Sequence, residues 1–150
     1  KFSEIKARLG EDPLREDALA ETVWQKMQKS SSAIGSLLLN QSVIAGIGNV
    51  YRAEILYLLS IHPQMPANEI ERHTFDELWE LTVELLNIGV KHNRIVTAGF
   101  NASGRVPKRL KASERLHIYK RSHCPACGSP VKTWALANRK MYACGKCQKL

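Results

Sequence analysis

Four cysteines near the C-terminus are the side chains best suited to chemistry in this 150-residue sequence. They follow the pattern Cys124-x2-Cys127-x16-Cys144-x2-Cys147 and account for all the cysteine in the chain. Each CxxC turn directs two thiolates toward one point, and four thiolates favour a tetrahedral zinc ion. Four sulfur ligands leave no open position for water, so the metal would be structural. We therefore predict one structural Zn²⁺, with His123 as a bystander next to Cys124.

Two other uses of the four cysteines are possible. They could form two disulfides in an exported protein, or one CxxC could be a redox motif. The sequence shows no secretory signal at its start, and no βαβ pattern surrounds either CxxC. Zinc is the favoured interpretation.

The residues between the two CxxC turns predict a β-hairpin. Val131–Leu136 and Lys140–Ala143 are short runs typical of strands, and Ala137-Asn138-Arg139 is the expected turn between them. A zinc-ribbon unit of about 30 residues is too small to fold without its metal.

A second candidate site is the glycine turn Gly46-Ile47-Gly48-Asn49, which opens a predicted helix. Glycines let the backbone approach a phosphate closely, and the free amides of a helix start point at it. The Asn49 amide can add a hydrogen bond. The alternative is a turn that serves only to pack two helices together.

The charge is divided unevenly along the chain. Residues 1–90 carry 8 basic and 13 acidic side chains, whereas residues 91–150 carry 14 basic side chains and Glu114 as the only acid. A basic tail on an acidic body is typical of a polyanion-binding protein, although a solvated charged surface would look similar. No run of 18 apolar residues is present, so we expect no membrane span.

Apolar periodicity predicts a mainly α fold ahead of the hairpin. We expect helices from Asp12-Pro13 to Met27, over residues 34–40, from a capping Asn49 to a stop at His62-Pro63, and from a Thr74/Glu77 capping box to about Lys91, with a short helical turn near residues 66–71. The predicted organisation is a helical domain over residues 1–95, a basic linker over 96–116 and a zinc hairpin over 117–150.

Two stretches carry a family resemblance. Residues 37–56, LLLNQSVIAGIGNVYRAEIL, closely resemble the helix–two-turn–helix signature of the formamidopyrimidine-DNA glycosylase / endonuclease VIII family. Residues 119–148 resemble its zinc finger, and LGEDPL at 9–14 resembles the entry into its helical domain. The resemblance implies a helix–two-turn–helix DNA-binding domain followed by a four-cysteine zinc β-hairpin.

The resemblance also implies a set of DNA contacts, namely Gln41, Gly46, Gly48, Asn49, Arg52 and Arg139. Asn49 matches the asparagine that holds a phosphate at the lesion, and Arg139 matches the hairpin arginine that grips flanking phosphates, for which a forked guanidinium is well suited. Gln41 occupies a phosphate-contact position, or else forms a hydrogen bond at a helix C-terminus. Arg52 stands where endonuclease VIII members often have arginine, which favours the branch acting on oxidised pyrimidines.

The sequence departs from the family pattern in three ways. Met141 replaces a residue that is often Thr or Ser, and residues 101–116 do not align clearly. The family's catalytic proline, glutamate and lysine are also missing, since the chain starts Lys1-Phe2-Ser3-Glu4. We expect an N-terminal catalytic domain to be missing from the same polypeptide and the chain to be inactive alone.

The function implied is the DNA-binding part of a bifunctional base-excision-repair glycosylase and AP lyase, acting on oxidised bases and abasic sites in double-stranded DNA. We expect a cytoplasmic monomer, associated with the nucleoid in a bacterium. One alternative is a stand-alone zinc-containing nucleic-acid-binding module without catalysis, and another is a zinc module that binds protein.

Overall fold

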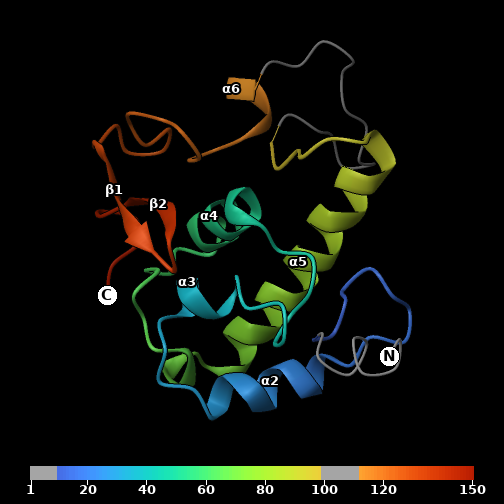
Figure 1. Cartoon of the computed structure of the whole chain (residues 1–150). Helices are drawn as coiled ribbons and strands as arrows, with labels where there is room; N and C mark the ends of the chain where they lie inside the picture. The colour runs from blue at the N-terminus through green and yellow to red at the C-terminus, as the bar shows by residue number, and fades with distance from the viewer. Residues whose placement is uncertain (1–9, 99–111) are drawn as a thin grey trace.

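The computed structural model describes residues 10–98 and 112–150. In chain order its elements are α2 (Ala20–Gln28), α3 (Ile34–Leu37), α4 (Asn49–Leu58), the 3-10 helix η1 (Ala67–Glu69), α5 (Arg72–His92), α6 (Ala112–Arg115), β1 (Val131–Leu136) and β2 (Arg139–Cys144). Helices α2 to α5 form a helical body, residues 10–95, and the hairpin lies beside α4 in a finger formed by residues 117–150 (Figure 1). The mainly α fold with a small four-cysteine hairpin is confirmed.

Helix α5 is the longest element and its apolar stripe faces the core. Its buried residues are Phe75, Leu78, Thr82, Leu85, Leu86, Ile88 and Gly89. The predicted end near Lys91 is confirmed, because the helix stops at His92 and Asn93 takes a left-handed φ of 52°. The predicted Thr74/Glu77 capping box is wrong. The helix begins at Arg72 without a side-chain cap, and Thr74 already lies inside it, as the hydrogen bond from the Phe75 N–H to the Glu71 carbonyl shows.

Helix α2 begins later than its sequence predicts. The expected start at Asp12-Pro13 is wrong, because the Asp12 carboxylate accepts the Leu14 N–H at 2.9 Å and the Asp12 carbonyl accepts the Arg15 N–H at 3.0 Å. Asp-Pro therefore closes a turn instead of capping a helix. Leu19 is extended, and the helix starts at Ala20.

Helix α4 lies at the centre of the molecule, between α5 and the hairpin (Figure 1). Seven consecutive residues, 51–57, are buried. Asn49 was expected to cap this helix, but Gly48 is the capping residue and Asn49 is the first helical one. The helix ends at Leu58, before His62-Pro63, and Ser60 follows with a φ of 56°. The preceding helix α3 ends at Leu37, short of the predicted Asn40, and mainly turns follow until Ile44, which forms a β-bridge with Glu11.

The hairpin follows the predicted pairing with a tighter turn. β1 and β2 are antiparallel, with Val131 opposite Cys144 at one end and Leu136 opposite Arg139 at the other. Only Ala137 and Asn138 lie between the strands, with φ angles of 56° and 61°. Two successive left-handed residues are typical of a type I′ hairpin turn. Arg139 is therefore the first residue of β2 instead of part of the turn.

One apolar core joins the helical body to the finger. Ile55 and Leu56 of α4 belong to the same buried cluster as Ile118, Met141 and Cys144. Met141 is fully buried, which accounts for an apolar side chain at this position. Within the described residues, no helix combines the length and apolar character needed to cross a bilayer.

The predicted basic linker falls largely outside the described residues, at 99–111. Its described ends lie side by side, because the N–H groups of Thr97 and Ala98 both donate to the Arg115 carbonyl, at 2.7 and 2.8 Å. The two ends of the predicted linker, at residues 96 and 116, therefore lie close to each other in space.

Candidate metal centre and nucleic-acid interface

The four cysteine sulfurs converge at the base of the hairpin. Cys124 and Cys127 precede β1, Cys144 ends β2 and Cys147 follows it, and all four Sγ atoms lie within 4.8 Å of one another. The Sγ atoms of Cys124 and Cys147 are 3.9 Å apart, and those of Cys127 and Cys144 are 3.5 Å apart. Strand pairing causes this convergence, because the Val131–Cys144 pair closes the open end of the hairpin.

Each CxxC turn is closed by backbone hydrogen bonds. The Gly128 N–H donates to the Cys124 carbonyl at 2.9 Å, and Gly128 has a φ of 75° that favours glycine. In the second turn the Gln148 N–H donates to the Cys144 carbonyl at 2.8 Å. Both turns therefore hold their sulfurs in place through local geometry.

The pKa values of the thiols indicate that the cysteine cluster needs a cation to ionise fully. Hydrogen bonds from Ser129 lower the pKa of Cys127 to about 6, whereas hydrogen bonds with Cys127 and Cys144 raise the pKa of Cys147 to about 12. Four thiolates this close repel one another, so a cation is required for all of them to ionise together. The donor set fits a tetrahedral metal ion with four thiolate ligands. His123 is outside the set, and its Nδ1 lies 3.1 Å from the Ser122 hydroxyl.

The glycine turn is held by Gln41. The Gln41 carboxamide accepts the Gly46 N–H at 3.0 Å and donates to the Ile47 carbonyl at 3.2 Å. Gly46 needs to be glycine because its φ is 92°. Gln41 thus closes the turn before α4, and the Gly46 amide is already used inside the protein. Gly48 is exposed at the start of α4, where the first helical amides have no partner within the helix.

Asn49 and the hairpin are in direct contact. Asn49 donates through Nδ2 to the Lys140 carbonyl at 3.0 Å, although the two residues are 91 apart in sequence. The first residue of β2, Arg139, is exposed and adjacent to Lys140. The structure therefore brings together the glycine-turn asparagine and the hairpin arginine that the sequence singled out separately.

Arg52 connects α4 to the hairpin turn. Its Nη1 donates to the carbonyls of Leu136 at 2.8 Å and Gly35 at 3.0 Å. Its Nη2 donates to Asn49 Oδ1 at 2.8 Å and to the Arg139 carbonyl at 3.2 Å. The side chain is fully buried, and burial lowers its pKa to about 10. Arg52 was expected among the DNA contacts. In the structure its buried guanidinium forms hydrogen bonds that orient Asn49 and fix the hairpin turn.

Gly35 makes this arrangement possible. A Cβ atom added at Gly35 would lie 2.6 Å from the Leu136 side chain of the hairpin and 3.1 Å from the Pro63 carbonyl oxygen. The hairpin therefore rests directly on the backbone of α3, and that backbone supplies a carbonyl for Arg52.

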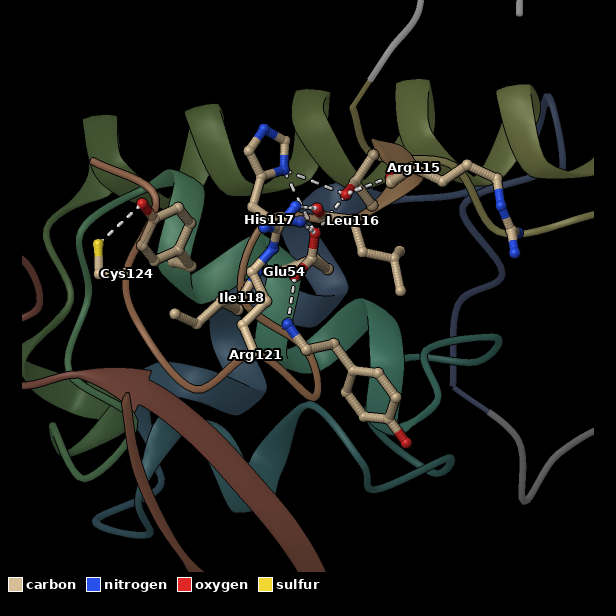
Figure 2. Close-up of polar contacts among 10 residues, drawn as sticks. Glu54, Arg115, Leu116, His117, Ile118, Arg121 and Cys124 are labelled. Carbon is tan, nitrogen blue, oxygen red and sulfur yellow. Dashed lines mark hydrogen bonds and ion pairs between the residues drawn. The ribbon is translucent and has the colours of Figure 1, made fainter. Parts of the chain in front are cut away.

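Glu54 is a residue that the sequence reasoning did not identify. Its buried carboxylate accepts the N–H groups of His117 at 2.5 Å, Ile118 at 2.7 Å and Tyr119 at 3.0 Å, and it also accepts the Thr97 hydroxyl. Figure 2 shows Glu54 pointing from α4 into the loop formed by Leu116, His117 and Ile118. Burial alone would raise the pKa of this carboxyl, but hydrogen bonds from His117 and Thr97 bring it below its ordinary value. The available signal was a lone acid flanked by apolar residues in α4.

Gln148 ends the stretch that resembles the family's zinc finger, but the sequence predicted no role for it. It is fully buried, accepts the Cys144 N–H at 2.8 Å and donates to the Ile61 carbonyl at 3.0 Å. It therefore ties the second CxxC turn to the segment that follows α4. A glutamine that follows the last cysteine gives no sequence signal for this role.

The exposed side of the hairpin is basic and hollowed. A groove of about 520 Å³ lies along it, lined by Thr133, Trp134, Ala135, Asn138, Arg139 and Lys140. Two of the lining side chains are cations, and Trp134 donates from its indole N–H to Gln64 at 3.1 Å. Lys140 is shared by this groove and by the contact with Asn49, which its carbonyl accepts.

Fold and site together define a helix–two-turn–helix domain with a four-cysteine finger docked on its second helix. The formamidopyrimidine-DNA glycosylase H2TH domain matches residues 9–100. The chain is 37% identical over 150 residues to "Endonuclease 8 1" of Mycobacterium tuberculosis, covering 99% of this chain and 56% of that protein. It is 36% identical over 143 residues to the formamidopyrimidine-DNA glycosylase of Latilactobacillus sakei, covering 93% of this chain and 50% of that protein.

The fold is also that of a solved relative. The formamidopyrimidine-DNA glycosylase of Lactococcus lactis, in a complex with DNA containing an abasic site, has a TM-score of 0.79 at 27% identity, covering 99% of this chain and 55% of that one. The chain belongs to the formamidopyrimidine-DNA glycosylase / endonuclease VIII family. It spans about half the length of the relatives it matches.

Proposed function

We propose that this chain is the DNA-gripping portion of a bifunctional base-excision-repair DNA glycosylase and AP lyase that acts on oxidised bases and abasic sites. The observation that carries the proposal is the contact between Asn49 and the Lys140 carbonyl. Arg52 supports this contact, because it donates to both Asn49 and the Arg139 carbonyl. It joins two candidate phosphate-binding elements, a helix start and a hairpin tip, into one surface. The Lactococcus lactis relative bound to abasic-site DNA supports the same reading.

On this surface the chain's residues have separate tasks. The exposed Arg139 guanidinium offers forked hydrogen bonds to phosphate oxygens. The amides at the start of α4 favour an anion through their unpaired N–H groups and the helix dipole. Asn49 adds a polar side chain whose position Arg52 fixes. These contacts hold the backbone and carry no base identity, so lesion specificity comes from elsewhere in the enzyme.

We further propose that Cys124, Cys127, Cys144 and Cys147 hold one structural Zn²⁺. The ion would neutralise part of the thiolate charge and keep the base of the hairpin closed. The finger has few buried apolar residues of its own, so the metal would supply much of its stability. Catalysis would come from a domain in the same polypeptide outside these 150 residues. The whole enzyme would act on damaged double-stranded DNA, and it would do so as a monomer.

The proposal is tested by fluorescence anisotropy with the zinc-loaded chain. We expect tighter binding to a duplex with a tetrahydrofuran abasic-site analogue than to the intact duplex, and a steep fall of affinity between about 50 and 200 mM salt. Equal affinity for both duplexes would favour the stand-alone nucleic-acid module instead. Absence of salt-dependent binding to either duplex would overturn the proposal and favour a protein-binding zinc module.

A further inference from the structure

The metal centre receives a hydrogen bond from outside the finger. Tyr57 lies near the end of α4 and is 8% exposed, and its hydroxyl is 3.2 Å from the Sγ of Cys124. Cys124 is itself only 2% exposed. Figure 2 shows this contact as the dashed line that ends on the sulfur of Cys124, close to the segment that Glu54 holds.

The direction of this hydrogen bond follows from metal chemistry. A cysteine bound to zinc is a thiolate without a proton, so it can only accept. The Tyr57 hydroxyl must then be the donor, and the bond is assisted by the sulfur's negative charge. Burial of both partners excludes water, which would otherwise supply the same hydrogen bond.

The other sulfur contacts described come from within the finger. The Cys147 N–H lies 3.4 Å from Cys144 Sγ, and Ser129 donates to Cys127. Those donors are present in any folded knuckle, whether or not the helical body is attached. Tyr57 is different because it is 67 residues away from its sulfur in sequence.

We propose that Tyr57 is a positioning residue of the metal centre, whose hydroxyl donates to the Cys124 thiolate and makes metal affinity depend on helix α4. The inference rests on the proposed zinc site and deepens it. Outer partners of metal ligands orient the ligand and tune its basicity. By linkage, an interaction that strengthens metal binding when the finger is seated on α4 also strengthens that seating when metal is bound.

This coupling matters because α4 carries Asn49 and Arg52 at its other end. A single helix of 10 residues thus contacts the hairpin tip at its start and a metal ligand near its end. The occupied metal centre therefore helps to fix where Arg139 lies relative to Asn49.

The test is metal affinity of the Tyr57→Phe variant of the whole chain, which keeps the ring and removes only the hydroxyl. We expect competition with a chromophoric chelator to show zinc binding weakened by roughly 10-fold or more, and the thiolate-to-cobalt absorption bands of the Co²⁺ form to shift. Tyr142→Phe is the matched control. It removes a hydroxyl from another buried tyrosine, whose described contacts are with the Tyr119 ring and the Lys140 ammonium group.

A second measurement needs no variant. In the wild-type chain loaded with ¹¹³Cd, the Tyr57 hydroxyl proton should exchange slowly and show scalar coupling to the metal through the sulfur. Unchanged zinc affinity and unchanged cobalt bands in Tyr57→Phe, or an uncoupled hydroxyl proton in the cadmium form, would overturn this inference and leave the DNA-binding proposal standing. A wild-type chain that binds no zinc would overturn both the metal assignment and the role of Tyr57.

Discussion

The helical body and the finger carry the same number of cations but are built on different principles. Residues 10–95 contain 7 Lys and Arg with 12 Asp and Glu, whereas residues 117–150 contain 7 Lys and Arg with no acid. The body buries a broad apolar core along α5, and the finger closes on four sulfurs. The acidic residues of the body therefore make it a net-acidic scaffold, whereas the acid-free finger is a surface suited to polyanions.

The two regions also depend on each other. The two regions share one apolar core, and α4 also forms hydrogen bonds with the finger from four positions along the helix. Asn49 and Arg52 hold the hairpin, Glu54 holds the entry segment, and Tyr57 contacts the Cys124 sulfur. The described contacts therefore place the base, the entry segment and the turn of the finger against α4.

Loss of the metal should separate the regions most strongly. In Cys144→Ser we expect the finger to unfold and metal binding to fall sharply, because the apparent stabilisation by a structural zinc is on the order of 10 kcal/mol. Far-ultraviolet circular dichroism should still report the helices of the body, and the metal content by mass spectrometry should drop. Chelation of the wild-type chain should reproduce the result. Slow amide exchange at β1 and β2 in the metal-free variant would contradict this prediction.

Truncation of a core side chain should instead destabilise the helical body. Phe75 is fully buried and its ring lies 5.2 Å from that of Trp24. Phe75→Ala should lower the free energy of unfolding of the body by about 3–5 kcal/mol, measured by urea denaturation. Val90→Ala on the same helix is the control, because Val90 is 67% exposed and its truncation leaves no cavity. Equal effects of the two variants would show that α5 is not the basis of the core.

The connection through Glu54 should appear as a pH dependence. Because the folded-state pKa of Glu54 lies below its ordinary value, its carboxylate stabilises the fold above the unfolded-state pKa, and this stabilisation is lost as the pH falls through the folded-state pKa. At neutral pH, Glu54→Gln should cost about 1.5–3 kcal/mol, the typical value of a hydrogen bond to a charged group.

The same variant should flatten the acid side of the stability curve, measured by thermal unfolding at a series of pH values. The control is Glu84→Gln, since Glu84 is exposed on α5. Faster deuterium exchange at the amides of His117, Ile118 and Tyr119 would locate the effect. An acid slope as steep in Glu54→Gln as in the wild type would refute the role of this carboxylate.

The smallest effects should be those of single phosphate contacts. Asn49→Ala and Arg139→Ala should each weaken binding to an abasic-site duplex by roughly 1–3 kcal/mol at fixed salt. Arg139→Lys should recover part of the loss, because lysine keeps the charge without the fork. Arg15→Ala is the matched control, since this exposed arginine pairs with Asp17 in the body. Full affinity in both test variants would count against the proposed interface.

Much of the fold followed from local patterns. The stripe on α5, the strand from Val131 to Leu136 and the cysteine spacing all rest on interactions between near neighbours in sequence, so their periods are visible in the residues themselves. The first residues of the helices were harder to predict from the sequence. Asp12 formed its own turn and Gly48 took the capping position expected of Asn49, because short polar side chains have several backbone partners of similar energy.

The cluster of four cysteines, the hairpin and the basic character of the finger were thus determined by the sequence alone, because each depends on residue type and short spacing. Only the tertiary structure decided the partners of Arg52, Glu54, Tyr57 and Gln148, which lie as much as 87 residues away and are in part backbone groups. A backbone carbonyl or amide has no side-chain identity to read. Which one meets a buried charge is set by how the elements pack, and that packing places Asn49 against the hairpin.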